Sequence, residues 1–289
     1  MSEALIIRQD GPTRFITMNR ADRHNAFDDI LIGELTAAFK AAATDPATRV
    51  IVLDSTGKSF SAGADLNWMR RMAEYDHAQN LADSQALAGL MAVIDSSPKP
   101  VIGVVQGPAY GGGVGLAACC DMVVSAETAS FCLSEVKLGL IPAVISPYVV
   151  RAIGGRAARR YFQTAETFSA AKAAVLGLVS EVVPAEHLEA VRDRWIKALS
   201  ANGPIAMAAA KELAVRATEQ ELNDDLRAWT AERIASIRAS DEGREGVRAF
   251  LEKRKAGWIG ASEARDWPIE GPRADASASQ ARGTRAPGD

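Results

Sequence analysis

Apolar and polar residues follow two kinds of pattern along the first 183 residues of the chain. Short continuous apolar runs indicate buried strands, and apolar residues three or four positions apart indicate helices. The two strands predicted first are separated by Asp10-Gly11-Pro12, which indicates a hairpin. Strands that alternate with helices are typical of an α/β fold. We predict strands over 5–8, 13–18, 50–53, 101–105, 122–125, 130–133 and 178–183, and helices over 27–43, 66–72, 78–94, 147–153, 156–164 and 169–176.

From Glu186 onward the periodicity is helical only. We therefore divide the chain into a core with the candidate site (1–199), a helical region (200–258) and a tail (259–289). The tail has few bulky apolar residues and many Ala, Ser, Pro, Gly and Arg residues, so we expect it to be disordered. The helices predicted in this part of the chain cover 188–200, 205–217, 222–237 and 246–255.

The composition argues against several classes of protein. A net charge of −3 over 289 residues favours neither nucleic acid nor an anionic membrane as the partner. No apolar stretch approaches ~18 residues and no leader pattern opens the chain, so we expect neither a transmembrane helix nor a signal peptide. Cys119, Cys120 and Cys132 lie in apolar surroundings without metal-site spacing. We expect them to be reduced, in a cytoplasmic protein that holds no metal.

A glycine-rich stretch from Gln106 to Asp121 follows the strand predicted over 101–105. Its three consecutive glycines, Gly111 to Gly113, cost backbone entropy, which indicates that the main chain approaches something closely. The apolar segment after them is predicted to be a buried helix, whose first N–H groups would face an anion. Two interpretations remain open: a backbone site for a phosphate or a reaction oxyanion, and a tight turn with close helix packing.

A second small-residue loop, Ala62-Gly63-Ala64-Asp65, follows the strand predicted over 50–53. Asp65 is placed to cap the helix over 66–72. If the strands before the two loops are neighbours, both loops end at the same edge of the core. One N–H group from each loop could then bind a single oxygen atom, and losing one such donor typically costs about 3 kcal/mol of transition-state stabilisation.

Glu135 is the candidate acid or base. It lies in an apolar run from Phe131 to Val136, and partial burial would raise its pKa towards neutrality, which suits general acid–base catalysis. The alternative is a solvated glutamate at a helix N-terminus. Gly113-x-Gly115-x-x-Ala118 also matches the loose dinucleotide fingerprint. A dinucleotide site is not favoured, because the strand that should end at the acidic residue ends at Ser125 instead.

Three motifs, taken as a set, resemble the enoyl-CoA hydratase/isomerase (crotonase) family: Phe60-Ser61-Ala62-Gly63-Ala64-Asp65-Leu66, Gly107-x-x-x-Gly111-Gly112-Gly113 and Glu135-x-x-x-Gly139-x-x-Pro142. The resemblance covers residues 1–258. It implies an α/β, crotonase-like spiral of ββα units with a C-terminal helical trimerisation region, assembled as a homotrimer or a dimer of trimers. It also implies an acyl-CoA substrate and no cofactor beyond the CoA that the substrate carries.

By motif position, the resemblance assigns the family's oxyanion hole to the backbone amides of Ala64 and Gly112, beside the catalytic Glu135. The two lysines near the C-terminus flank Arg254 in a basic stretch that meets CoA phosphates in the family, sometimes in a neighbouring subunit. The alternative is that these cations complement a helix C-terminus. The residues implied to bind the substrate or its CoA are Arg23, His24, Ala26, Ala62, Asp65, Leu66, Gly111, Lys253 and Lys255.

One position departs from the family's hydratases, which carry a first glutamate where this chain has Gly115. A single glutamate at the position of Glu135 is the pattern of the family's double-bond isomerases. The segments 63–69, 131–140 and 146–154 nevertheless resemble methylglutaconyl-CoA hydratases of leucine degradation, and hydratases of acyclic terpene breakdown. That branch also tends to lack the first glutamate.

In such an enzyme the substrate's own carboxylate, or another side chain near the acyl end, would position the water. Trp68, Tyr110, Tyr148 and Arg151 are candidates, with core packing or a surface charge as the alternative for each. The prediction is a hydro-lyase that reversibly hydrates a branched, dicarboxylic 2-enoyl-CoA such as 3-methylglutaconyl-CoA to the 3-hydroxyacyl-CoA. The first alternative is an enoyl-CoA isomerase, and the second is a non-catalytic acyl-CoA or RNA binding protein of the same fold.

Overall fold

The computed structural model describes residues 4–259 of the chain. Within these residues, a six-stranded sheet in the order β1-β2-β3-β4-β6-β9 forms the centre of the molecule. The first two strands form the predicted antiparallel hairpin, and the later neighbours in this sheet pair in parallel. The strands span Leu5–Asp10 (β1), Thr13–Met18 (β2), Val50–Ser55 (β3), Val101–Val105 (β4), Met122–Ala126 (β6) and Glu181–Val183 (β9).

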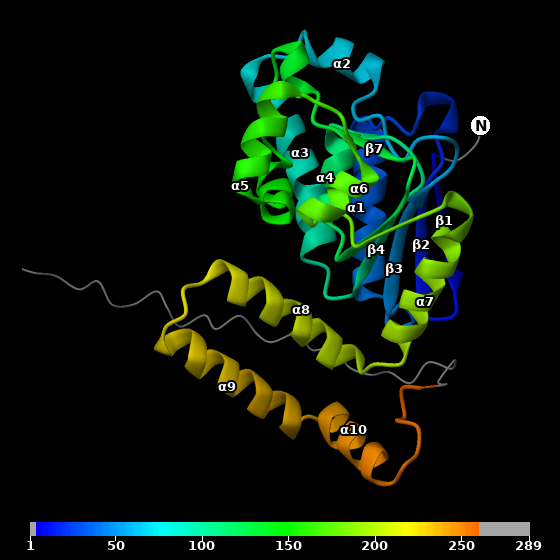
Figure 1. Ribbon diagram of the computed structural model, residues 1–289, viewed down its shortest axis with the longest axis vertical. Helices are drawn as coiled ribbons and strands as arrows, with labels where there is room; N and C mark the ends of the chain where they lie inside the picture. Colours follow the sequence, from blue (N-terminus) through cyan, green and yellow to red (C-terminus); the bar gives the residue numbers. More distant parts are fainter. Residues whose placement is uncertain (1–3, 260–289) are drawn as a thin grey trace, which may run out of the picture.

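Helices and a second, smaller sheet surround the central sheet (Figure 1). The smaller sheet has the order β5-β7-β8, with strands Ala109–Tyr110, Ser130–Cys132 and Phe168–Ser169. The α-helices span Asp29–Thr44 (α1), Leu66–Met72 (α2), His77–Asp95 (α3), Gly112–Ala118 (α4), Ser146–Thr164 (α5), Ala170–Leu176 (α6), Leu188–Ser200 (α7), Pro204–Glu219 (α8), Asp224–Ala239 (α9) and Asp241–Leu251 (α10). Short 3-10 helices cover Ala21–Arg23 (η1), Glu135–Leu138 (η2) and Ala185–His187 (η3).

Two strands followed by a helix recur along the chain, as in β1–β2–α1, β4–β5–α4 and β6–β7–α5. In the later repeats the first strand belongs to the central sheet and the second to the smaller sheet. The chain therefore winds from one sheet to the other and back, which confirms the predicted α/β spiral of ββα units.

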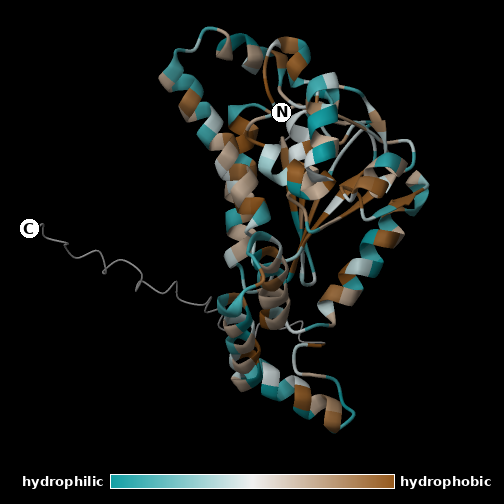
Figure 2. Ribbon diagram, turned by 60° about the vertical axis from the view of Figure 1, so that its left-hand side comes forward, coloured by the Kyte–Doolittle hydropathy of each residue, from teal (hydrophilic) through white to brown (hydrophobic). Residues whose placement is uncertain are grey.

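The central strands are buried because they are apolar along most of their length. All five residues of β4 are buried, and residues 50–53 of β3 have no exposed surface. Parallel strands covered on both faces have such continuous apolar runs. Here α7 packs against β3, β4 and β6, whereas α1 packs against β1, β2 and α3. Figure 2 shows the hydrophobic strands inside a shell of mixed helices.

Several predicted boundaries were wrong. The last strand of the central sheet begins at Glu181 rather than at 178, and the two-residue strands β5 and β8 are too short to produce a pattern. By contrast, the predicted division between helices 147–153 and 156–164 is confirmed, because α5 is kinked at Gly154, which has a non-helical backbone (φ 77°). The last helix begins at Asp241 rather than at 246, because Ser240 caps it.

The C-terminal helices α8, α9 and α10 extend away from the central sheet (Figure 1). The division of the chain near residue 200 stays a prediction, and the predicted disordered tail lies outside the described residues except for Ile259. Between residues 4 and 259, no helix has the length and apolar content needed to span a bilayer.

Candidate active site

The two glycine-bearing loops meet because the strands before them are neighbours. β3 and β4 pair in parallel with Leu53 opposite Gly103, so the chain leaves both strands at the same edge of the sheet. Beyond them, Tyr110 N donates to Ser61 O at 2.9 Å. Gly63 has φ 87°, and a Cβ atom there would lie only 3.0 Å from Tyr110 O. Glycine alone combines that conformation with so close an approach, so it allows the loops to touch.

The amides predicted to form the oxyanion hole lie where these loops meet. Phe27 bridges the first loop by donating to Gly63 O and accepting from Asp65 N, each at 2.9 Å. The amide of Ala64, which lies between them, therefore points away from Phe27. Gly112 begins α4, whose first N–H groups have no acceptor inside the helix. Within residues 4–259 neither amide donates to another protein group, so both are available to a ligand.

Phe27 also limits the second loop. A Cβ atom on Gly112 would lie 2.2 Å from Phe27 Cζ, so this position has space for glycine only. The ring of Phe27 lies 6.2 Å from that of Trp68, whose Nε1 donates to Asp83 Oδ1 at 3.1 Å. Trp68 is 3% exposed, and its contacts are those of a core residue, the alternative that the sequence left open.

The Glu135 carboxylate lies beside the second loop. A Cβ atom on Gly111 would be 3.3 Å from Glu135 Oε1. The glutamate opens η2, a single turn closed by Leu140 N donating to Glu135 O at 3.1 Å. Burial raises the pKa of Glu135, against a smaller lowering by its own backbone amide. Among the described residues, nothing donates a hydrogen bond to its buried Oε2. A raised pKa and an open oxygen are properties of a group that exchanges protons with a substrate.

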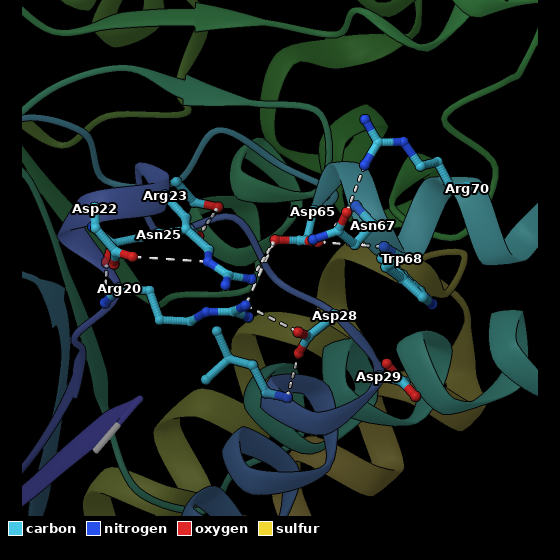
Figure 3. Close-up of polar contacts among 12 residues, drawn as sticks. Arg20, Asp22, Arg23, Asn25, Asp28, Asp29, Asp65, Asn67, Trp68 and Arg70 are labelled. Atoms are coloured by element: carbon cyan, nitrogen blue, oxygen red, sulfur yellow. Dashed lines mark hydrogen bonds and ion pairs between the residues drawn. The ribbon is translucent and has the colours of Figure 1, made fainter. Parts of the chain in front are cut away.

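Charged side chains connect the loop 20–27 to the first loop (Figure 3). Arg20 Nη2 lies 3.0 Å from Asp28 Oδ2 and 3.6 Å from Asp65 Oδ2. Arg23 Nη1 lies 3.3 Å from the same oxygen of Asp65. Arg23 and Asp65 are predicted binding residues, whereas Arg20 and Asp28 are not among the predicted ones. The only sequence feature that points to this network is the pair Arg20 and Arg23, three positions apart, and a solvated loop can have the same spacing.

Asp65 is the predicted N-cap of α2. Its Oδ1 accepts from the amides of Asn67 at 2.8 Å and Trp68 at 3.3 Å. Burial alone would raise the pKa of Asp65, but these two amides, together with Arg23 and Arg20, hold it below its usual value. Asp65, the residue directly after Ala64, is therefore ionised. Its carboxylate caps α2 and pairs with two arginines.

The loop 20–27 is pinned by a buried side chain. Asn25 has φ 52°, and its Nδ2 donates to Thr56 O at 2.7 Å and to Ser59 O at 2.8 Å. Ala62 N donates to His24 O at 2.9 Å, which attaches this loop to the next. These contacts bring seven of the predicted substrate-binding residues to one edge of the core: Arg23, His24, Ala26, Ala62, Asp65, Leu66 and Gly111. Their contact with a substrate stays a prediction.

The predicted basic stretch lies elsewhere. Lys253 and Lys255 follow α10, at the opposite end of the molecule from α2 (Figure 1). The chain therefore does not bring these lysines to its own loops, and their contact with CoA stays a prediction.

The other candidates for the acyl end contact protein groups. Arg151 forms ion pairs with Asp95 and, at 3.7 Å, with Glu219. Its guanidinium carbon lies 5.8 Å from the ring centroid of Tyr148. The hydroxyl of Tyr110 lies 3.3 Å from a serine hydroxyl in β7. These contacts agree with the structural alternatives, and Arg151 in particular is already neutralised.

Gly115 has no space for a side chain, because a Cβ atom there would lie 2.2 Å from Ile145 Cγ2. Glu135 is therefore not paired with a second carboxylate at that position. Within the described part of the chain, no group of three or more His, Cys, Asp or Glu side chains is placed to hold a metal ion. The three cysteines are unpaired.

Comparison with known proteins agrees with this geometry. The family model described as enoyl-CoA hydratase/isomerase matches residues 12–261. A solved enoyl-CoA hydratase from Shewanella pealeana is 46% identical, with a TM-score of 0.86, over 89% of this chain and 96% of that one. The 2,3-dehydroadipyl-CoA hydratase of Escherichia coli K12 is 34% identical over 255 residues, covering 88% of this chain and 97% of that protein. The mitochondrial enoyl-CoA hydratase of Pongo abelii is 34% identical over 242 residues, covering 83% of this chain and 81% of that one. The chain therefore belongs to the enoyl-CoA hydratase/isomerase (crotonase) family.

Proposed function

We propose that this protein reversibly hydrates a 2-enoyl-CoA to a 3-hydroxyacyl-CoA. The observation that carries the proposal is the half-buried Glu135 carboxylate, whose buried Oε2 has no described partner and whose Oε1 lies next to Gly111 at the junction of the two loops. Hydratases among the relatives support the same activity. The proposed reaction class is that of a hydro-lyase.

In this mechanism the thioester carbonyl oxygen of the substrate accepts hydrogen bonds from the N–H groups of Ala64 and Gly112. Glu135 takes a proton from water as the water oxygen bonds to the β-carbon. The electron pair of the double bond moves towards the thioester, giving an enolate whose charge the two amides stabilise. Glu135 then returns the proton to the α-carbon, so that one water is added and the carboxylate is regenerated.

The substrate's CoA would lie along the loop 20–27, which carries Arg23, His24 and Ala26. Ala62, Leu66 and their neighbours line the same edge. Lys253 and Lys255 would contact CoA phosphates from a neighbouring subunit, since they lie far from the loops of their own chain. CoA is part of the substrate, and the mechanism uses no further cofactor.

For the acyl group we propose a chain with a second carboxylate, with 3-methylglutaconyl-CoA of leucine degradation as the favoured case. The name of the E. coli relative, 2,3-dehydroadipyl-CoA hydratase, denotes an unsaturated acyl-CoA with a second carboxyl group. The chemistry also fits: because Gly115 supplies no carboxylate, a carboxylate on the substrate would take over the positioning of water.

A specific observation favours a second candidate, a double-bond isomerase. Ile145 fills the space at Gly115, which leaves Glu135 as a single carboxylate. One carboxylate is sufficient to move a proton from one acyl carbon to another. Product analysis distinguishes the two reactions, because isomerisation adds no water.

We further propose a homotrimer or a dimer of trimers in the cytoplasm. Large apolar side chains on the last helix support an assembly, since Val247, Phe250 and Leu251 are 59%, 82% and 72% exposed. Exposed apolar patches of this kind mark protein interfaces. The unpaired cysteines are consistent with a reducing compartment.

The test is a panel of unsaturated acyl-CoAs, including 3-methylglutaconyl-CoA and crotonyl-CoA, read by mass spectrometry for the gain of one water. We expect Glu135→Gln to lower kcat by about 10²–10⁴-fold, because it removes the acid–base group, while CoA binding persists. Hydration requires ionised Glu135, so kcat/KM should fall as the pH drops through the pKa of this group, above its usual value of 4.5. The variant should lack that acidic limb.

Glu127→Gln is the matched control, since Glu127 is an exposed glutamate between β6 and β7. It should leave both turnover and the pH profile unchanged. Full activity of Glu135→Gln would remove Glu135 from its role, and a moved double bond without water uptake would establish the isomerase instead.

A further inference from the structure

Two glycines about one helical turn apart, at the start of α4, lie against two different side chains. Gly111 is the N-cap of the helix, and a Cβ built on it would lie 3.3 Å from Glu135 Oε1. Gly115 is the fourth residue of the helix. A Cβ atom on Gly115 would lie 2.2 Å from Ile145 Cγ2 and 2.8 Å from Ile145 Cβ. Non-bonded carbon atoms pack at about 3.5–4.0 Å, so no side chain fits at position 115 beside Ile145.

Ile145 has little freedom to move aside. It is 3% exposed and lies directly before α5, where Val149 N donates to its carbonyl at 3.0 Å. Its β-branched side chain is stiff at χ1. Met91 Cε would lie 3.4 Å from a Cβ on Gly115. The side chain of Met91 is fully buried, and its Sδ accepts a hydrogen bond from Cys119 Sγ at 3.6 Å. Both atoms that crowd Gly115 therefore belong to the packed core.

We propose that Ile145 is a specificity-determining residue that restricts the site to the single carboxylate of Glu135. The inference rests on the proposed hydration and gives it a substrate class. Because Ile145 fills the space at Gly115, the protein supplies one carboxylate, that of Glu135, to hold the water. Substrates that bring their own carboxylate near the β-carbon complete the site, and monocarboxylic 2-enoyl-CoAs do not.

The test is a cycle of four proteins: the wild type, Gly115→Glu, Ile145→Ala, and the double variant. The midpoint of thermal unfolding reports on packing. We expect Gly115→Glu to lower it strongly and Ile145→Ala to lower it moderately, because the first overfills the site and the second opens a cavity. The double variant should be more stable than the sum of the two single changes predicts, because the removed isoleucine makes room for the new side chain.

Activity with crotonyl-CoA and 3-methylglutaconyl-CoA reports on chemistry. The wild type should prefer the dicarboxylic substrate. We expect the double variant to raise kcat/KM for crotonyl-CoA at least about tenfold over the wild type, which is below the about 10²–10⁴-fold that a natively positioned acid–base group contributes. The matched control combines Gly115→Gln with Ile145→Ala, which provides similar volume without an acid. It should recover stability without the gain in activity.

Three outcomes would overturn the inference: wild-type stability of Gly115→Glu alone, strictly additive unfolding midpoints, or a crotonyl-CoA gain in the glutamine control equal to that of the glutamate. Failure of the proposed function is recognised separately. In that case the wild type hydrates none of the 2-enoyl-CoAs, while the stability cycle still measures the coupling between the two positions.

Discussion

The core and the C-terminal helices are held together by different means. In the core, side chains such as Ile51, Leu53 and Val105 have no exposed surface, and the strands pack between helices. In α8–α10 the only buried apolar side chains of the described chain are Ala209, Leu226 and Ala249, whereas Phe250 is 82% exposed. The core thus holds its loops in place with contacts from its own chain. The helical region has an apolar surface that its own chain leaves uncovered.

Polar contacts connect the two regions. Arg49, directly before β3, donates from Nη1 to Ser200 O at 3.1 Å and to Trp258 O at 3.0 Å. Lys211 of α8 pairs with Asp121 at 2.9 Å. Among residues 4–259, the contacts that hold the loops of the site come from the core alone, and the proposed role of the helical region is in assembly.

The largest expected effect is in the core. Asp65→Asn keeps an oxygen to cap α2 but removes the charge that holds Arg20 and Arg23. We expect kcat/KM to fall about 10–100-fold, because a shift of the first loop by a fraction of an ångström misplaces the Ala64 amide. Steady-state kinetics should show the loss mainly in kcat.

Asp22→Asn is the control for that variant, because the side chain of Asp22 is 79% exposed and pairs with Arg23 only at 3.8 Å. It should retain wild-type kinetics. If Asp65→Asn is as active as the control, the charged network supports α2 without positioning the oxyanion loop.

The core is also the region that sequence reasoning predicted best. Continuous apolar runs located β3 and β4, and the Asp65 cap followed from its place before an apolar helix. Each of these features is decided by neighbours in the sequence. Because β3 and β4 are adjacent, the predicted meeting of the two loops was confirmed as well.

Features that depend on distant residues were missed. The contact of Arg20 with Asp65 joins separate loops, and the packing of Ile145 against Gly115 joins the start of α5 to α4. Nothing local in the sequence reports such pairs. The two lysines near the C-terminus follow the motif of the family, but they lie at the opposite end of the molecule from α2, so their contact with CoA stays a prediction.

A smaller effect is expected where the two regions join. Arg49→Met removes hydrogen bonds to the carbonyls of Ser200 and Trp258 while keeping an apolar stem of similar length. We expect a loss of about 2–3 kcal/mol in the free energy of unfolding, since bonds to a charged donor are worth more than neutral ones. Hydrogen exchange should show faster opening of α8–α10 than of the central sheet.

Arg227→Met provides the comparison for Arg49, because the Arg227–Asp224 pair is exposed on both sides (60% and 98%) and contributes little. A uniform rise in exchange across the sheet and α8–α10 in the Arg49 variant would show that the two regions unfold as one unit.

The smallest effect on intrinsic stability is expected on the exposed face of α10. Phe250 is 82% exposed, so Phe250→Ser should change the free energy of unfolding of the isolated chain by less than about 0.5 kcal/mol. If this face is an interface between copies of the chain, the same change should lower the molar mass measured by light scattering. The neighbouring Ala249 is 2% exposed and serves as the contrast, because Ala249→Ser changes the interior and not the surface. An unchanged mass for Phe250→Ser would mean that the apolar side chain of Phe250 does not form a contact between copies of the chain.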